Sequence, residues 1–120
     1  MGYETDLKLF IDGAWKAGEG RDTHTVLNPV TAEGMADVPY ATKADLEEAL
    51  AASARAWPEW RETDVEKRGA ILHKAAKLLR ERAEAIGQTL TQEQGKPIAE
   101  AKAEVLGSAQ LFDWYAEDAK

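Results

Sequence analysis

The first third of the chain, residues 7–40, has the short alternation of apolar and polar positions that is typical of β-strands. Alternating apolar positions lead up to Asp12-Gly13, which supplies the two-residue turn of a β-hairpin. Two more short strands are predicted at residues 25–27 and 35–38, where Asn-Pro and Glu-Gly pairs mark the turns. We therefore expect one hairpin and further short strands in this region.

From residue 43 to residue 120 the pattern changes to the three- and four-residue spacing of amphipathic helices. Thr42 and Asp45 form a capping box at the start of the first helix, and Pro58 is expected to end it. The apolar face of this helix consists of Leu46, Ala49, Leu50, Ser53 and Trp57.

A second capping box, Thr63 with Glu66, predicts the start of the next helix. The helical pattern that begins here is long, so we expect the helix to bend or break near residues 81–84. Arg68 falls inside its apolar stripe on a helical wheel, which predicts a buried or half-buried structural arginine with carboxylate or carbonyl partners. The stripe consists of Ile71, Leu72, Ala75, Leu78, Leu79, Ala83, Ile86 and Leu90.

The segment TQEQGKPIAEAKAEV, residues 91–105, is predicted to form a corner between two helices. Gly95 suits the left-handed position that follows a helix, and Pro97 suits the first turn of the next one. The third helix should run to the end of the chain, because apolar residues recur at spacings of three and four. These residues are Ile98, Ala101, Val105, Ala109, Phe112 and Ala116.

Composition and charge narrow the classes of partner. With 22 acidic and 15 basic residues among 120, the net charge is −7, so nucleic acid and anionic membrane are poor partners. The N-terminus lacks a signal-peptide pattern, and no apolar run approaches the roughly 20 residues of a membrane span. We therefore expect a cytoplasmic protein that forms one domain or part of a larger one.

The glycine patterns do not support a phosphate or dinucleotide site. Gly95-Lys96 is followed by Pro97 and lacks a glycine five positions upstream, so the phosphate-loop spacing fails. Gly18 and Gly20 lack the third glycine and the strand-to-helix change of a dinucleotide-binding turn. The chain has no cysteine, which excludes thiolate nucleophiles and thiolate metal sites within these residues.

The titratable side chains also favour structural roles. The only two histidines are His24 and His73, and the helical wheel places His73 about 150° from the apolar stripe, so both are predicted to be solvated. Glu100 and Glu104 share a helix face, but two like charges on an acidic helix are typical of a wet surface. General acid/base catalysis would also need a partner group at a defined spacing.

The ordered set of segments FIDGAW, NPVTAEGMADVPYA and TQEQGKPIAEAKAEV, followed by FDWYAEDAK, resembles the N-terminal segment of NAD(P)-dependent aldehyde dehydrogenases. The similarity covers nearly the whole chain and is greatest to the succinate-semialdehyde and 2-oxoglutarate-semialdehyde dehydrogenase branch. It implies an α/β fragment of the aldehyde dehydrogenase fold, in which an N-terminal β-hairpin and short strands precede three or four long helices.

The resemblance also implies which parts of the enzyme residues 1–120 contain. They would form the N-terminal part of the cofactor-binding domain, β-rich over 7–40 and helical over 43–120, without the catalytic domain. The family's cysteine nucleophile, general-base glutamate, catalytic asparagine and nicotinamide-binding turn all lie further along the chain. No catalytic or cofactor-binding residue is therefore assigned here, and NAD or NADP is expected only for the full-length enzyme.

Some members of the resembling family hold a monovalent cation near the acidic residue that precedes the Gly-Lys-Pro. Carried over to this sequence, the ligands would be Glu93 with Val26 and Leu27, which precede the Asn-Pro turn. The structural alternative is that Glu93 is only a carboxylate near the end of a helix.

Two functional classes remain open at this point. One is the N-terminal part of a semialdehyde-oxidising dehydrogenase, which would be inactive alone and would pair with the remainder of the enzyme in a homo-oligomer. The other is a free-standing helical protein-interaction domain of the same ancestry. The third helix is apolar on more than one face, which predicts that a partner surface covers it.

Overall fold

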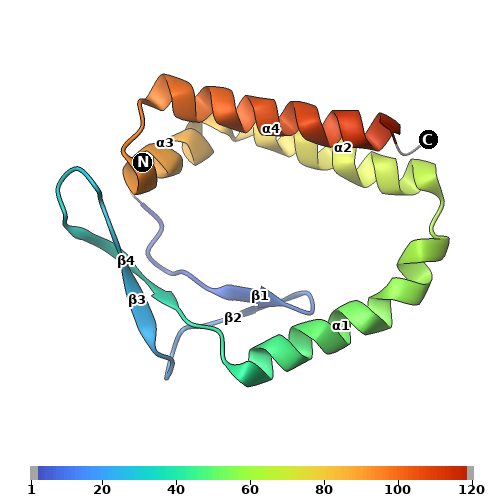
Figure 1. Ribbon diagram of the computed structural model, residues 1–120, viewed down its shortest axis with the longest axis horizontal. Coiled ribbons are helices and arrows are strands. Elements are labelled where there is room, and N and C mark those ends of the chain that lie inside the picture. The colour runs from blue at the N-terminus through green and yellow to red at the C-terminus, as the bar shows by residue number, and fades with distance from the viewer. Residues whose placement is uncertain (1–2, 119–120) are drawn as a thin grey trace. The chain divides into compact units, whose positions relative to one another are not determined.

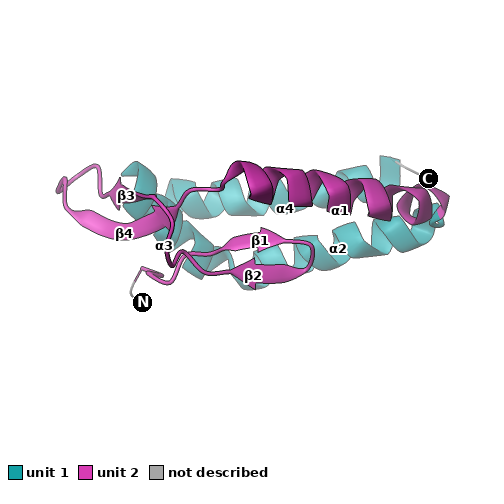
Figure 2. Cartoon of the chain, turned by 90° about the horizontal axis from the view of Figure 1, so that it is seen from below, with its two compact units in different colours: residues 1, 63–120 teal, residues 2–62 magenta. Residues whose placement is uncertain are grey.

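The computed structural model describes residues 3–118, which divide into two compact units (Figure 2). Unit 2 extends to Glu62 and contains the strands and the first helix, whereas unit 1 begins at Thr63 and contains three helices. The element order is four short strands and then four helices (Figure 1), which confirms the predicted α/β class.

Unit 2 contains two antiparallel two-stranded sheets, β1–β2 and β3–β4. In the first hairpin, Asp12 has φ 51° and Gly13 has φ 78°, the left-handed pair that a two-residue turn requires. The predicted Asp-Gly turn is therefore confirmed. The strands are β1 (Leu9–Ile11), β2 (Ala14–Lys16), β3 (Thr23–Leu27) and β4 (Gly34–Pro39).

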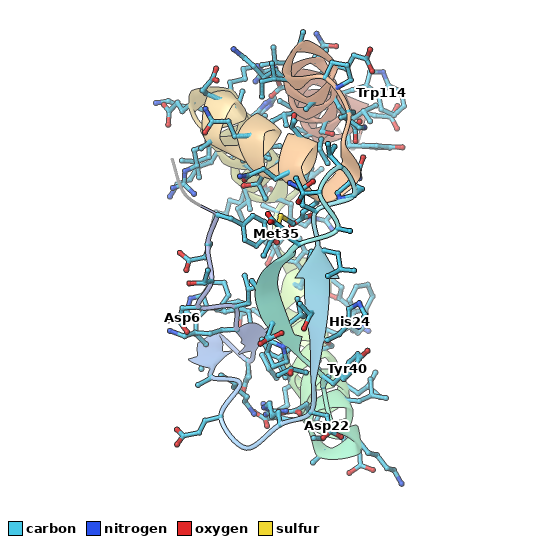
Figure 3. All side chains as sticks on the ribbon, turned by 90° about the vertical axis from the view of Figure 1, so that its left-hand side faces the viewer. Asp6, Asp22, His24, Met35, Tyr40 and Trp114 are labelled. Carbon is cyan, nitrogen blue, oxygen red and sulfur yellow. The ribbon has the colours of Figure 1, made fainter. Side chains whose placement is uncertain are left out.

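The β3–β4 pair carries polar contacts across its strands. Thr25 lies directly opposite Asp37, and its Oγ1 donates a hydrogen bond of 2.6 Å to the carboxylate. His24 pairs with Val38, so Tyr40, two residues on, lies on the same face as His24; their ring centroids are 6.3 Å apart (Figure 3). The pairing shifts by one residue between Val26 and Leu27, as in a β-bulge.

Helix α1 (Lys43–Glu62) begins at the predicted capping box. The backbone N–H of Thr42 donates to the Asp45 carboxylate at 2.8 Å, and the N–H of Asp45 donates to the Thr42 hydroxyl at 3.2 Å. The prediction that Pro58 ends the helix is wrong, because α1 continues to Glu62. A proline here leaves the carbonyl of Ala54 without its helical donor, and this exposed stretch leaves that carbonyl accessible to water.

Unit 1 contains α2 (Val65–Glu81), α3 (Ala83–Gln94) and α4 (Ile98–Asp118). The predicted break near residues 81–84 is present at Arg82. The cap of α2 differs from the prediction: Asp64, not Thr63, is the N-cap, and its side chain accepts a hydrogen bond of 2.8 Å from the N–H of Glu66.

The corner at residues 95–97 has the predicted form. Gly95 ends α3 with φ 73°, and its N–H donates to the Thr91 carbonyl at 2.8 Å. The carbonyl of Pro97 accepts bonds of 3.0 Å from the N–H groups of Glu100 and Ala101, so Pro97 initiates α4.

Small residues line the seam along which α2 and α3 run antiparallel to α4. A Cβ added at Gly69 would lie 3.2 Å from the Ala116 carbonyl oxygen, and one added at Gly87 would lie 2.8 Å from Cγ of Lys102. We call this the small-residue seam. Its buried members are Gly69, Ala76, Ala83 and Gly87 on one side and Ala101, Ala109 and Ala116 on the other. These small side chains let the helix backbones approach closely.

The fully buried contact of the second helix with α4 is not centred on the predicted apolar stripe. On a helical wheel the seam residues Gly69 and Ala76 lie roughly 120° from the centre of that stripe. Ile71 is exposed and Leu72, Leu78 and Leu79 are only half-buried. The stripe of α1 is also largely exposed, including Leu46, Leu50 and Trp57. In both helices the large apolar residues are therefore not the ones that are fully buried within the described residues.

Candidate functional site

The residues predicted to bind a monovalent cation lie on two elements in different units. Val26 and Leu27 belong to β3 of unit 2, where Val26 is half-buried and Leu27 exposed. Glu93 belongs to the last turn of α3 in unit 1, and its side chain is exposed. Because the structure defines each unit by itself, the cation site stays a prediction.

An ion-paired carboxylate anchors the N-terminus of α1 in unit 2. Asp45 is 4% exposed and accepts hydrogen bonds from both terminal nitrogens of Arg21, the Nη2–Oδ1 bond measuring 2.9 Å. The Arg21 guanidinium, aided by Thr42, holds the pKa of the Asp45 carboxyl far below its usual range. Lys16, which pairs with Glu48, lies 3.8 Å from the same carboxylate. This cluster is a structural tie between the strand region and α1.

The prediction that both histidines are solvated holds for His24, which is exposed, whereas His73 is half-buried and has carboxylate partners that the sequence did not predict. The His73 Nδ1 lies 2.7 Å from Oδ1 of Asp113, and its Nε2 lies 2.8 Å from Oε1 of Glu117. Both carboxylates belong to α4, whereas His73 belongs to α2. Arg80, two turns further along α2, contacts the second oxygen of Asp113.

The electrostatics of this cluster follow from its geometry. Hydrogen bonds to Asp113 and Glu117 raise the pKa of the His73 imidazole above its ordinary value. In turn, His73 and Arg80 hold the pKa of Asp113 below its usual range. The cluster joins two helices and is open to solvent, with the His73 side chain 41% exposed. It therefore resembles a salt-bridge network more than a catalytic centre.

The signal that identifies the His73 face is the spacing of small residues. Gly69, Ala76 and Ala83 recur every seven positions, and His73 falls between the first two on the same side of the helix. Asp113 and Glu117 are spaced by four on α4, so one histidine between the helices is able to contact both. A helical wheel centred on the largest apolar residues does not reveal this face.

Arg68 is half-buried, as predicted, but its predicted partners are not observed. Within residues 3–118 its guanidinium makes no hydrogen bond or ion pair, and only its backbone N–H is bonded, to the Asp64 carbonyl at 3.1 Å. The stem of an arginine covers apolar surface while the charged end stays in water. Arg68 therefore lies at the N-terminal end of the apolar stripe without a structural ion pair.

An apolar groove runs between α2 and α4 on the side of α2 that carries the apolar stripe. It comprises two adjoining hollows of about 450 Å³ and 340 Å³, which share Ser108 and Phe112. We call it the α2–α4 groove. Its remaining lining residues are Leu72, Ala75, Leu78, Leu79, Arg82, Ile86, Leu111 and Tyr115. Leu111 and Tyr115 are more than half exposed, so the groove presents a contiguous apolar surface.

The glycines and the lysine of the failed phosphate-loop and dinucleotide patterns have structural roles. Gly18 accepts a bond of 3.1 Å from the Arg21 N–H, and Gly20 has φ 73°, so the two glycines shape a turn between β2 and β3. Lys96 contacts Glu104 across the corner between α3 and α4. None of the helices in the described residues is long and apolar enough to cross a membrane.

The sequence matches a protein-family model described as the aldehyde dehydrogenase family over residues 15–120. It is 45% identical over 96 residues to the succinate semialdehyde dehydrogenase [NAD(P)+] Sad of Escherichia coli, covering 79% of this chain and 21% of that protein. It is 36% identical over 113 residues to a glutarate-semialdehyde dehydrogenase of Pseudomonas putida, covering 94% of this chain and 24% of that one.

Solved structures show the same similarity. Succinate-semialdehyde dehydrogenase from Burkholderia pseudomallei matches with a TM-score of 0.87 and 35% identity, over 92% of this chain and 23% of that chain. Aldehyde dehydrogenase 21 from Physcomitrella patens, solved with its reaction product succinate, matches with a TM-score of 0.89 and 34% identity. The match covers 97% of this chain and 24% of that chain. The chain spans between a fifth and a quarter of the length of these relatives. It belongs to the aldehyde dehydrogenase family.

Proposed function

We propose that this chain is the N-terminal part of the cofactor-binding domain of an aldehyde dehydrogenase that oxidises the semialdehyde of a short dicarboxylic acid to the acid with NAD(P). The observation that supports it best is the 45% identity to a succinate semialdehyde dehydrogenase, together with the similarity to a glutarate-semialdehyde dehydrogenase. The predicted cytoplasmic location and homo-oligomeric assembly belong to the same proposal.

The 120 residues alone are proposed to be catalytically incompetent. Oxidation of an aldehyde through a thiohemiacetal needs an activated cysteine thiolate, and the sequence has no cysteine. The described residues also do not fit a dinucleotide: both sheets are antiparallel pairs, and the Gly18–Gly20 turn connects two strands rather than a strand and a helix. NAD(P) binding is therefore assigned to the remainder of the full-length enzyme.

We propose that this remainder covers the α2–α4 groove. The groove is lined almost entirely by apolar side chains, of which Leu111 and Tyr115 are more than half exposed. Large contiguous apolar patches are unusual on isolated soluble domains and are normally buried by a partner surface. The matched segment makes up only 21% and 24% of these two relatives, and the rest of such a chain would provide this surface.

The monovalent cation at Glu93, Val26 and Leu27 remains part of this proposal. A carboxylate and backbone carbonyls are oxygen donors, the ligand class that hard cations prefer. Thermal unfolding of the full-length enzyme in sodium, potassium or choline chloride of equal ionic strength tests it. Stabilisation by one alkali ion that Glu93→Gln abolishes is the expected result, and equal midpoints in all three salts would contradict the site.

A chimera tests the main proposal. Residues 1–120 replace the matched N-terminal segment of the E. coli succinate semialdehyde dehydrogenase, and formation of reduced cofactor is followed with succinate semialdehyde and with glutarate semialdehyde. The chimera is expected to turn over at least one of them, and the isolated 120-residue chain is expected to turn over neither. Val105→Asp in the chimera serves as the unfolded control, because Val105 is buried in α4.

Two results would contradict the proposal. Turnover by the isolated chain would show that it contains catalytic residues of its own. A chimera that folds, binds NAD(P) and remains inactive with both semialdehydes would show that these 120 residues do not serve this reaction.

A further inference from the structure

Both ring nitrogens of His73 face carboxylate oxygens, and a neutral imidazole cannot donate a hydrogen bond to both. Its two ring nitrogens lie 2.7 Å and 2.8 Å from carboxylate oxygens of Asp113 and Glu117. An ionised carboxylate only accepts hydrogen bonds, and a neutral imidazole has one N–H donor and one lone pair. One nitrogen of a neutral ring would thus direct its lone pair at a carboxylate, whereas the imidazolium donates to both.

The surrounding charges place the proton on the histidine rather than on a carboxyl group. Asp113 accepts from Arg80 with one oxygen and from His73 with the other, which favours its ionised form. Glu117 is 60% exposed, so water stabilises its charge. From α3, the nearest charged pair is formed by Glu84 and Lys102 of α4, about three helical turns away along α4. At that distance neither Glu84 nor Lys102 forms a hydrogen bond with the His73 ring.

The C-terminal end of α4 carries no positive side chain of its own, so a positive charge from another helix stabilises it. Its last turns carry Asp113, Glu117 and Asp118, and the last turn contains no basic residue. Negative side chains are unfavourable near the negative end of a helix dipole. His73 and Arg80 of α2 supply the missing positive charge across the seam.

We propose that His73 is an imidazolium clamp that fastens the last two turns of α4 to α2, and that loss of its proton releases this end of α4. The clamp acts where Gly69 lies against Ala116 and where no large apolar side chain among the described residues is fully buried, so its ion pairs contribute to the docking of this end. Leu111, Phe112 and Tyr115 lie on the same turns, so release of the helix end also opens the α2–α4 groove. The docking of the α4 end onto α2 is thus expected to depend on pH.

Nuclear magnetic resonance of the whole 120-residue chain tests the clamp. Ring nitrogen shifts of His73 are expected to report both nitrogens protonated at pH 6.5. Amide hydrogen exchange of residues 112–118, corrected for intrinsic rates, is expected to lose roughly fivefold protection between pH 6 and pH 8.5, the upper range for a solvent-exposed ion pair. Amides near Ala101 and Val105 provide an internal reference, because that end of the seam lacks the histidine.

Variants separate the clamp from a general effect of pH. His73→Gln is expected to remove the pH dependence, Glu117→Gln to reduce it by about half, and His24→Gln, at the exposed histidine, to leave it intact. If His73→Gln does not fold, the ring nitrogen shifts of the wild-type chain still test whether the folded chain holds His73 as an imidazolium. A neutral His73 ring at pH 6.5 in the folded chain, or a pH dependence that persists in folded His73→Gln, would overturn the proposal.

Discussion

Arg21 binds Asp45 through both terminal nitrogens of its guanidinium group, and the bond from Nη2 to Oδ1 measures 2.9 Å. The same carboxylate accepts from the backbone N–H and the hydroxyl of Thr42, at 2.8 Å and 2.7 Å. The aspartate predicted only as part of a capping box therefore also fixes the loop after β2 to the start of α1.

Replacing Asp45 by Asn is expected to weaken unit 2. The amide keeps the shape of the side chain but removes the charge that faces Arg21, and it directs an N–H group toward other donors. We expect the thermal midpoint to fall by roughly 5 °C or more, with faster hydrogen exchange in the first turns of α1. Glu47→Gln is the matched control, because Glu47 is exposed on the same helix and its ion pair with Lys43, at 3.7 Å, is exposed as well. Equal midpoints for the two variants would show that the Arg21 contact does not stabilise the fold.

Acid is expected to destabilise both units. The pKa of Asp45, lowered mainly by Arg21, and those of Glu84, lowered by Lys102, and Asp113, lowered mainly by His73, all lie below their usual values. A depressed folded-state pKa stabilises the fold at pH values above the unfolded pKa, 3.8 for Asp and 4.5 for Glu, and this stabilisation is lost as pH falls further.

Thermal unfolding between pH 7 and pH 2.5 measures this acid dependence. Lys102→Met is expected to flatten the part of the curve that begins near pH 4.5, because it removes the partner of Glu84. Lys43→Met, which removes only an exposed contact on α1, should leave the curve unchanged. A curve that is flat below pH 4.5 in the wild-type chain would contradict the assignment of these carboxylates as stabilising groups.

Two helical glycines are expected to respond in opposite directions to substitution by Ala. Gly107 in α4 has nothing within 4 Å of an added Cβ, so Gly107→Ala should stabilise by about 0.5–1 kcal/mol through helix propensity. At Gly69 the added Cβ would lie 3.2 Å from a backbone oxygen of α4, so the seam must widen. We expect Gly69→Ala to cost about 1–3 kcal/mol despite its better propensity. Urea unfolding of both variants checks this, and a stabilised Gly69→Ala would show that the seam is loosely packed.

The α2–α4 groove is expected to make the isolated chain self-associate into dimers or higher oligomers. Leu111→Ser and Phe112→Ser should each reduce binding of a hydrophobic dye and shift sedimentation toward the monomer, because they make the groove polar. Trp114→Ser is the matched control: Trp114 is 56% exposed on the same helix but does not line the groove. A wild-type chain that sediments as a clean monomer without binding dye, or a Trp114→Ser effect equal to the other two, would refute this role of the groove.

Local signals predicted the parts of the fold that depend on only a few adjacent residues. The Asp12-Gly13 turn requires left-handed backbone conformations, and the corner at Gly95 and Pro97 combines a left-handed stop with a proline start. These conformations are set by the residues themselves, so the hairpin, the break between α3 and α4 and the α/β class could all be read from the sequence.

The contact faces of the helices could not be predicted in the same way. A helical wheel marks the largest apolar residues, which in α2 line the α2–α4 groove, whereas the fully buried residues of α2 are Gly69 and Ala76. His73 was consequently placed in solvent. The missing hydrogen bond of Pro58 predicts the end of a helix, but the exposed position tolerates this loss and α1 continues. The cation residues Glu93, Val26 and Leu27 still await a test.

The spacing of the small-residue seam has a consequence for how unit 1 finds its native alignment. Gly69, Ala76 and Ala83 recur every seven residues, and so do Ala109 and Ala116. If α4 slid by two turns along α2, Ala76 would meet Ala116 and Ala83 would meet Ala109, so the steric fit would be nearly as good. In that slipped state His73 would lose Asp113 and Glu117 and Glu84 would lose Lys102, although Arg80, seven residues after His73, would then lie opposite the same two carboxylates. The charged residues therefore select one alignment among several that the helix shapes allow.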